Sequence, residues 1–142
     1  ERYLGGLDFL ELLPAAEVAR LLQRAHARDV VAIDVAAESG ACDVLVVATG
    51  TSPQHLQRLA GAVAAALRAA CRAAGRLDLE GATPHVQGGP GEPWVALDCG
   101  SALVHLMLED CRAEVDLEGL WGADGGANIE RLAEPSTKDT LP

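Results

Sequence analysis

Large aromatic side chains are scarce in this sequence of 142 residues. It contains two Trp, one Tyr and one Phe, so aromatics make up 3% of the chain, whereas hydrophobic residues of all kinds make up 49%. A chain of this length can bury one compact core, but not comfortably two. That core must therefore be built from Ala, Val and Leu, and each Trp is a rare feature of the sequence.

Positively charged residues are also few. Lys and Arg total 11 against 21 Asp and Glu, which gives a formal net charge of −10. Affinity for nucleic acids depends largely on cationic side chains that displace phosphate counterions. Direct binding of RNA or DNA is therefore not expected. A basic protein surface is the natural complement, because opposite net charges accelerate encounter.

The four cysteines form no Cys-x-x-Cys pair and lie at Cys42, Cys71, Cys99 and Cys111. They indicate neither a zinc site nor a disulfide framework, and a reducing compartment is expected. No apolar run approaches the roughly twenty residues that a membrane span requires. The sequence begins at Glu1 rather than Met, which is expected of a chain that has been trimmed or processed.

Helical and strand patterns alternate in the first half, and a hairpin follows in the second. This order predicts an α/β fold with a mixed β-sheet and flanking helices over residues 14–122. Residues 1–13 form an N-terminal segment, and residues 123–142, rich in Gly, Pro and charge, predict an irregular C-terminal tail. The expected elements are helices over 14–27, 53–74 and 109–120 and strands over 30–35, 43–49, 85–87, 93–99 and 102–108.

The hairpin is the most informative segment, because Gly100-Ser101 suits a two-residue turn and so fixes the register. One face of the hairpin is then wholly apolar and must be core. The other face is mixed: it pairs Trp94 with Met107, Ala96 with His105 and Asp98 with Leu103. If a helix covers this mixed face, Trp94 is ordinary core. If none does, the face is an apolar patch rimmed by acid, typical of a protein-binding hot spot.

A catalytic interpretation starts from Gly50-Thr51-Ser52, which precedes a helix whose free amides could bind an anion. Nucleotidyltransferases use a similar turn, together with paired carboxylates that hold Mg²⁺. Neither Asp78-Leu79-Glu80 nor Asp116-Leu117-Glu118 lies on a predicted strand beside this turn, and the turn contains no Lys or Arg. The pattern favours a simple N-cap at Ser52, and a nucleotide-binding enzyme is the alternative.

Other catalytic arrangements have less support. The four histidines have no spacing that would place two of them on one helix face for a shared metal. A triad of Ser101, His105 and Asp98 would put its nucleophile at a hairpin tip with no oxyanion donors implied. We therefore predict no catalytic residues, no metal and no cofactor.

Five segments, in this order, resemble the ribosomal silencing factor family, also called Iojap-like. They cover roughly residues 15–122, and five motifs in register make the match specific. They are Ala-Arg-Asp-Val-Val at 27–31, Cys-Asp-Val-Leu-Val-Val-Ala-Thr-Gly-Thr-Ser at 42–52, Pro-Trp-Val-Ala-Leu-Asp-Cys-Gly-Ser at 93–101, Val-His-Leu-Met-Leu at 104–108 and Arg-Ala-Glu-Val-Asp-Leu-Glu-Gly-Leu-Trp at 112–121.

The resemblance implies a nucleotidyltransferase-like fold that has lost its catalytic residues. It also implies docking on ribosomal protein fourteen of the large subunit, where the factor sterically prevents small-subunit joining, either to silence ribosomes or to guard an immature large subunit. Where the family usually has aromatics, this chain has Val44, Leu45 and Val115. The residues expected at the interface, or supporting it, are Trp94, Asp98, His105, Met107, Arg112, Leu120 and Trp121.

The segment His105-Leu106-Met107-Leu108 is more similar to the mitochondrial branch of the family, whose members act in large-subunit assembly. For that branch the resemblance implies a place in the mitochondrial matrix and association with a small LYR-motif protein and a mitochondrial acyl carrier protein. Chloroplast stroma and bacterial cytoplasm are the alternative locations. A different class of function is a free adaptor whose hairpin edge pairs with a peptide strand.

Overall fold

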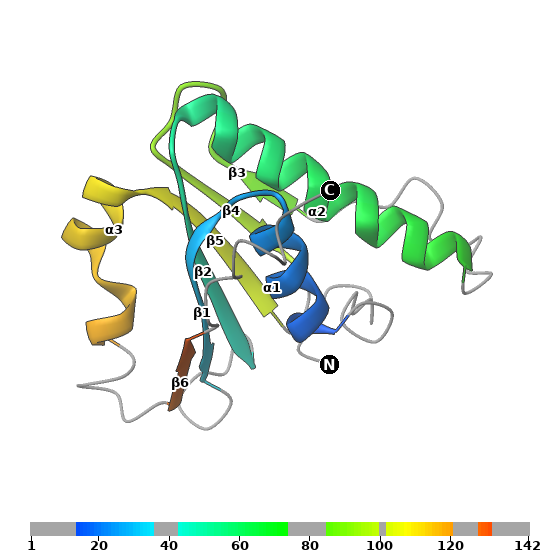
Figure 1. The fold of residues 1–142 in the computed structure, drawn as a ribbon, viewed down its shortest axis with the longest axis horizontal. Helices are drawn as coiled ribbons and strands as arrows, with labels where there is room; N and C mark the ends of the chain where they lie inside the picture. Colours follow the sequence, from blue (N-terminus) through cyan, green and yellow to red (C-terminus); the bar gives the residue numbers. More distant parts are fainter. Residues whose placement is uncertain (1–13, 36–42, 74–84, 100–101, 121–127, 132–142) are drawn as a thin grey trace.

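A computed structural model describes residues 14–35, 43–73, 85–99, 102–120 and 128–131 (Figure 1). Within these residues, six strands form one sheet in the order β3-β4-β5-β2-β1-β6. Strands β2 and β5 are parallel, and every other neighbouring pair is antiparallel. The strands are β1 (Arg28–Asp34), β2 (Val44–Gly50), β3 (His85–Gln87), β4 (Trp94–Asp98), β5 (Ala102–Leu108) and β6 (Asn128–Arg131). The predicted α/β fold with a mixed sheet is confirmed.

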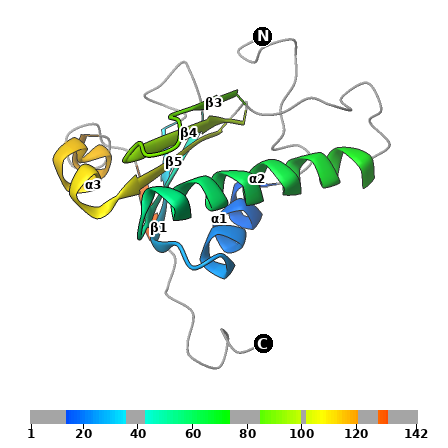
Figure 2. The same ribbon diagram turned by 90° about the horizontal axis from the view of Figure 1, so that it is seen from above.

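Helices cover the two faces of the sheet unequally. On one face lie α1 (Ala15–Arg24) and the long α2 (Pro53–Ala73), which run side by side beneath the strands in Figure 2. Their apolar stripes pack on the inward residues of β2, β4 and β5 to form the larger core cluster. On the other face lies α3 (Glu109–Val115), only seven residues long. The smaller cluster there consists of Val31, Ile33, Val35, Leu45, Val47 and Met107, with Leu103, Cys111, Val115 and Leu117 against it.

The hairpin has the register that the sequence predicts. Trp94 pairs with Met107, Ala96 with His105 and Asp98 with Leu103. The apolar face is completely buried under α2, with Val95, Leu97, Val104 and Leu106 all at 0% exposure. The two-residue period of the strands and the length of the turn were enough to determine which side chains are core.

Two predicted helices are shorter than expected, for a local reason in each case. Helix α1 ends at Arg24 because His26 takes a left-handed conformation (φ 71°) and the Ala27 amide donates back to the Leu22 carbonyl. Helix α3 ends at Val115 because Asp116 is also left-handed (φ 50°). Asn and Asp tolerate this conformation better than most residues.

The prediction of an irregular tail over residues 123–142 is wrong for Asn128–Arg131. This segment forms β6 and pairs antiparallel with residues 31–34 of β1. Its backbone supplies hydrogen bonds to an edge that β1 would otherwise leave open. A strand of four residues with one Ile shows no hydrophobic alternation, so the sequence pattern does not reveal it.

His55 ties the two helices on the larger core together. The Ser52 hydroxyl accepts a hydrogen bond from the His55 amide (3.0 Å), which confirms Ser52 as the N-cap of α2. The His55 ring lies 5% exposed between the helices. Its Nδ1 accepts from the Thr51 amide (3.0 Å), and its Nε2 therefore donates to the Ala25 carbonyl (2.9 Å) at the end of α1.

We predict that His55→Ala lowers the free energy of unfolding by about 2–3 kcal/mol, because the partly buried Ala25 carbonyl and the Thr51 amide lose these bonds and a cavity replaces the buried ring. Urea denaturation measures the change. The exposed neighbour Gln54 provides the control, since Gln54→Ala should stay within about 0.5 kcal/mol of the wild type. Equal effects of the two substitutions would show that the ring does not join the helices.

Candidate functional site

The candidate site is the part of the mixed hairpin face that no described helix covers. Helix α3 packs over the side of this face formed by β1, β2 and Met107. Beyond it, Trp94 is 36% exposed, Asp98 is exposed, and Ala96 and His105 are half-buried. Of the two interpretations of Trp94, ordinary core or surface patch, the described residues support the patch. We call Trp94, Ala96, Asp98 and His105 the hairpin patch.

Trp94 is held in place by its neighbour on β5. The indole Nε1–H donates to Nδ1 of His105 at 3.0 Å, and the two ring centroids lie 5.7 Å apart with the planes inclined at 50°. This bond requires an unprotonated Nδ1, so the imidazole must be neutral. Burial acts in the same direction, since desolvation lowers the pKa of His105 below its usual 6.5. His105 therefore fixes the orientation of Trp94 as an uncharged acceptor.

A hollow of about 380 Å³ lies beside this pair. The turn that leads into β4 forms part of its lining. Gly88 is required in this turn, because it has φ 101° and a Cβ would lie 2.4 Å from the Trp94 carbonyl oxygen. The Gln57 side chain of α2 donates to the Gly89 carbonyl (3.2 Å). The residues that line the hollow are Gln87, Gly88, Glu92, Pro93, Trp94, Ala96, His105 and Cys111.

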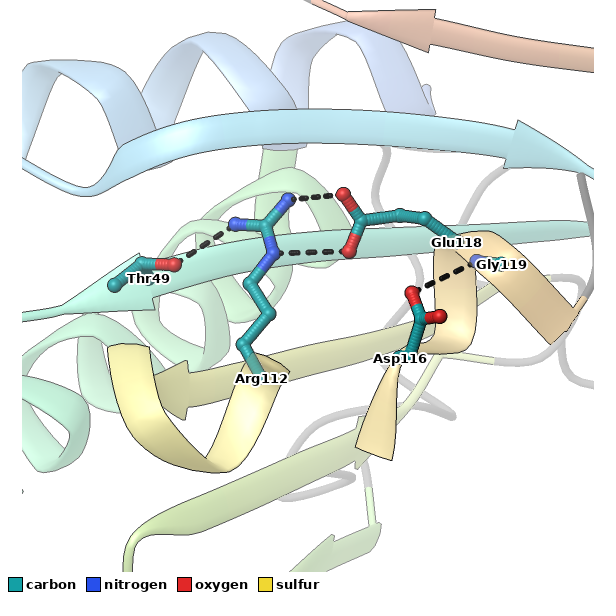
Figure 3. Close-up of polar contacts among 5 residues, drawn as sticks. All are labelled: Thr49, Arg112, Asp116, Glu118 and Gly119. Carbon is teal, nitrogen blue, oxygen red and sulfur yellow. Dashed lines mark hydrogen bonds and ion pairs between the residues drawn. The ribbon is translucent and has the colours of Figure 1, made fainter. Parts of the chain in front are cut away.

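Arg112 fixes the chain that follows α3 (Figure 3). Its Nε and Nη2 donate to the two carboxylate oxygens of Glu118, both at 3.1 Å, and its Nη1 donates to the Thr49 hydroxyl on β2 at 2.8 Å. Asp116 accepts from the Gly119 amide (3.0 Å) and so caps the helical turn that follows. This bidentate geometry is the strong form of an Arg–carboxylate pair, and it holds the turn with Leu120 against the sheet.

The structure divides the predicted interface residues into two groups. Trp94, Asp98 and Leu120 are exposed, Leu120 at 57%, and His105 is half-buried beside Trp94. Met107 (0% exposed) and Arg112 (8% exposed) are buried. These two can support an interface but cannot be its contact surface. Trp121 lies outside the described residues.

Sequence reasoning missed the residues at the rim of the hollow. Glu92 is an acidic residue in a turn-rich segment, and Cys111 belongs to no cysteine motif. Neither position therefore stands out in the sequence. Burial, with a further contribution from the nearby Glu114 carboxylate, raises the pKa of the Cys111 thiol. A signal was present in Gly88-Gly89-Pro90-Gly91, since such a run indicates a tight turn whose flanks approach another strand.

The Gly50-Thr51-Ser52 turn, considered above as an anion site, makes its contacts within the protein. Its Thr51 amide donates to the His55 ring, and its Ser52 hydroxyl receives the His55 amide. A Cβ at Gly50 would lie 2.5 Å from the Leu56 side chain, so this glycine serves close packing. Among the described residues, no three His, Cys, Asp or Glu side chains gather to hold a metal ion, and no helix is both long and apolar enough to cross a membrane.

A family model described as "ribosomal silencing factor during starvation" matches residues 11–141. The chain belongs to the ribosomal silencing factor family. A relative named "ribosomal silencing factor" from Treponema pallidum is 38% identical over 107 residues, which are 75% of this chain and 88% of that protein. The resemblance inferred from the five motifs is confirmed.

Organellar and structural relatives agree with this membership. The mouse protein named "mitochondrial assembly of ribosomal large subunit protein 1" is 31% identical over 71% of this chain and 42% of its own length. An Arabidopsis thaliana protein named "Iojap-related, mitochondrial" is 32% identical over 80% of this chain and 59% of its own length. A crystal structure of a Chromobacterium violaceum protein matches with a TM-score of 0.59 and 25% identity, covering 82% of this chain and 88% of that one.

We predict that Arg112→Ala lowers the free energy of unfolding by about 2–3 kcal/mol, because the partly buried Glu118 carboxylate loses its bidentate hydrogen bonds to the guanidinium. Chemical denaturation provides the measurement. The exposed ion pair between Arg20 and Glu17 offers a matched control, and Arg20→Ala should cost less than about 1 kcal/mol. An Arg112→Ala variant as stable as Arg20→Ala would contradict the role of this pair.

A pH titration tests the bond between Trp94 and His105. In the unfolded chain His105 takes up a proton near pH 6.5, whereas the folded protein does so only at lower pH. The stability that neutral His105 confers is therefore complete above about pH 6.5 and is lost as the pH falls from there toward the folded pKa. In a Trp121→Phe background, emission from Trp94 should change with a midpoint below 6.5. If the same change in emission occurs in the His105→Phe variant, a group other than His105 causes it.

Proposed function

We propose that this chain binds the large ribosomal subunit through the hairpin patch and sterically prevents the small subunit from joining. Trp94 is the observation that carries this proposal. It is one of two Trp residues in the chain, it is oriented by a hydrogen bond to His105, and it remains 36% exposed. A rigid, partly exposed Trp next to apolar neighbours is the residue type that dominates binding energy at protein interfaces.

Charge supports a basic protein as the docking partner, and we propose ribosomal protein fourteen of the large subunit. The chain has a formal net charge of −10, and the exposed carboxylates of Glu92 and Asp98 flank Trp94. Such a surface repels ribosomal RNA and attracts a basic protein that RNA does not cover. This chain would then contact ribosomal protein fourteen directly and would avoid the surrounding rRNA.

Buried residues of the site would act by positioning. Met107 lies beside the patch, packed under α3, as the cross-strand neighbour of Trp94. Arg112 forms a bidentate pair with Glu118 and so holds in place the turn that contains Leu120. The turn and the patch together would widen the surface that contacts the subunit.

Relatives are named for ribosomal silencing and for assembly of the large subunit, and occupation of a large-subunit surface is one physical step that would serve both. We propose this step for the present chain and place it in the mitochondrial matrix, where a small LYR-motif protein and an acyl carrier protein would accompany it. The mouse and Arabidopsis relatives carry mitochondrial names, which supports this location. Chloroplast and bacterial settings would use the same surface, and cell fractionation distinguishes the three.

A co-sedimentation experiment tests the docking. Purified protein should travel with isolated large subunits in a sucrose gradient and should reduce the yield of joined ribosomes when small subunits are added. Trp94→Ala should weaken binding by roughly thirtyfold, since interface hot spots contribute about 2 kcal/mol or more. Asp98→Lys should weaken it as well, because it reverses a charge that faces the basic partner.

The matched control is Glu17→Lys, which makes the same charge reversal on α1, the helix that covers the opposite face. It should bind like the wild type. Undiminished binding of Trp94→Ala and Asp98→Lys would move the docking surface away from the hairpin. Co-sedimentation without any loss of joined ribosomes would leave docking intact and refute the steric block.

A further inference from the structure

We infer that the hollow beside Trp94 is a socket for a single arginine side chain of the basic partner. This inference rests on the proposed function and specifies the chemistry by which the hairpin patch recognises its target. Four features of the hollow carry it: its aromatic wall, its charge, its rigidity and its size.

The aromatic wall of the hollow is the indole of Trp94, whose orientation is fixed by a hydrogen bond. The only donor of the indole, Nε1–H, is already bonded to His105. Trp94 therefore has no further hydrogen bond to offer an incoming group, and the ring itself is what remains available. Pro93 and Ala96 add apolar surface beside it. A flat cation that stacks on an indole gains an attraction that a neutral apolar side chain lacks.

The charge of the hollow favours a cation. Glu92 lines it with an exposed carboxylate, and no lining residue is Lys or Arg. His105 is the one lining residue that could become cationic, and as an acceptor of the Trp94 bond it is neutral. Gln87 and Gly88 also line the hollow, and their side-chain amide and backbone carbonyl oxygens are neutral acceptors. An arriving cation thus meets an anion and neutral acceptors.

The wall that carries Glu92 is preformed. The Glu92 amide closes a turn onto the Gly89 carbonyl (3.2 Å), and Gln57 of α2 bonds to that same carbonyl (3.2 Å). The Leu108 amide donates to the Pro93 carbonyl (3.0 Å) and ties the end of the turn to β5. Since Gly88 lies against the Trp94 backbone, the wall and the indole keep one spacing. Such preorganisation reduces the entropy cost of binding.

Size and shape favour arginine over lysine. A volume of about 380 Å³ is near the lower limit of small-ligand pockets, about 300–1,000 Å³, so it admits one long side chain and not a folded segment. The planar guanidinium can stack on the indole and still direct its edge donors at a carboxylate. The compact ammonium of lysine does not combine these two contacts.

A titration with small probes tests the socket without the ribosome. The Trp94 indole N–H signal of the folded protein is followed by NMR while N-acetyl-arginine methylamide is added at constant ionic strength. We expect a saturable shift with a midpoint on the order of tens of millimolar, the range for a single cation–π contact with a carboxylate. The neutral isostere N-acetyl-citrulline methylamide should give no saturable shift. Equal shifts with both probes, or no shift with either, would overturn the inference.

Variants test the socket on the large subunit. The Trp94→Phe variant keeps an aromatic face for the cation and should stay within about threefold of wild-type affinity. The Trp94→Leu variant keeps an apolar side chain without an aromatic face and should bind about tenfold more weakly. Glu92→Gln should weaken binding about threefold or more and flatten its salt dependence, while the matched control Glu17→Gln on α1 should not. Circular dichroism and thermal unfolding confirm that each variant is folded.

The two proposals fail in different ways. If wild-type protein binds large subunits but Trp94→Leu matches Trp94→Phe, or Glu92→Gln matches Glu17→Gln, the socket is wrong and the docking stands. If wild-type protein does not bind large subunits at all, the proposed function fails, and the titration with arginine and citrulline probes decides the socket by itself.

Discussion

The unequal helical cover of the sheet is the constraint on which the site depends. A helix is about 10 Å wide and neighbouring strands lie about 4.8 Å apart, so one helix covers roughly two strands. Two helices, one of them 21 residues long, pack on one face, while a helix of seven residues packs on the other. Strands β3 and β4 therefore keep a face that no described helix covers. Side chains on this face meet solvent, and Trp94 among them still exposes apolar ring surface.

In the hairpin patch, the indole N–H of Trp94 is bonded within the protein while part of the residue stays exposed. His105 Nδ1 accepts the only donor of the Trp94 indole across the β4–β5 pair, so the ring can stay exposed with its own N–H bonded. On α3, the guanidinium of Arg112 donates hydrogen bonds to Glu118 and Thr49. Both arrangements fix the orientation of the side chains that they join. This is the organisation expected of a surface that binds by shape and charge.

The parts of the fold and of the candidate site that the sequence predicts are those set by residues close together in the chain. The hairpin register follows from a period of two and a turn of two residues, which are local properties, and the sequence predicts it in full. The N-cap at Ser52 is local too. In contrast, the burial of Met107 depends on where α3 crosses the sheet, and the pairing of Arg112 with Thr49 joins residues 63 positions apart. Glu92 became part of the site only through a turn that α2 braces. Such contacts leave no periodic trace in the sequence.

The central parallel pair also governs when this chain can fold. Residues 44–50 of β2 form their ladder with residues 102–108 of β5, and the whole of α2 lies between them in sequence. A contact of such long separation must close a large loop before it contributes any stability, which slows folding. During synthesis, β1 and β2 can pair early, but the sheet lacks its centre until β5 has emerged. The hairpin patch and the core of the domain therefore form together, and a chain that stops before β5 would have neither.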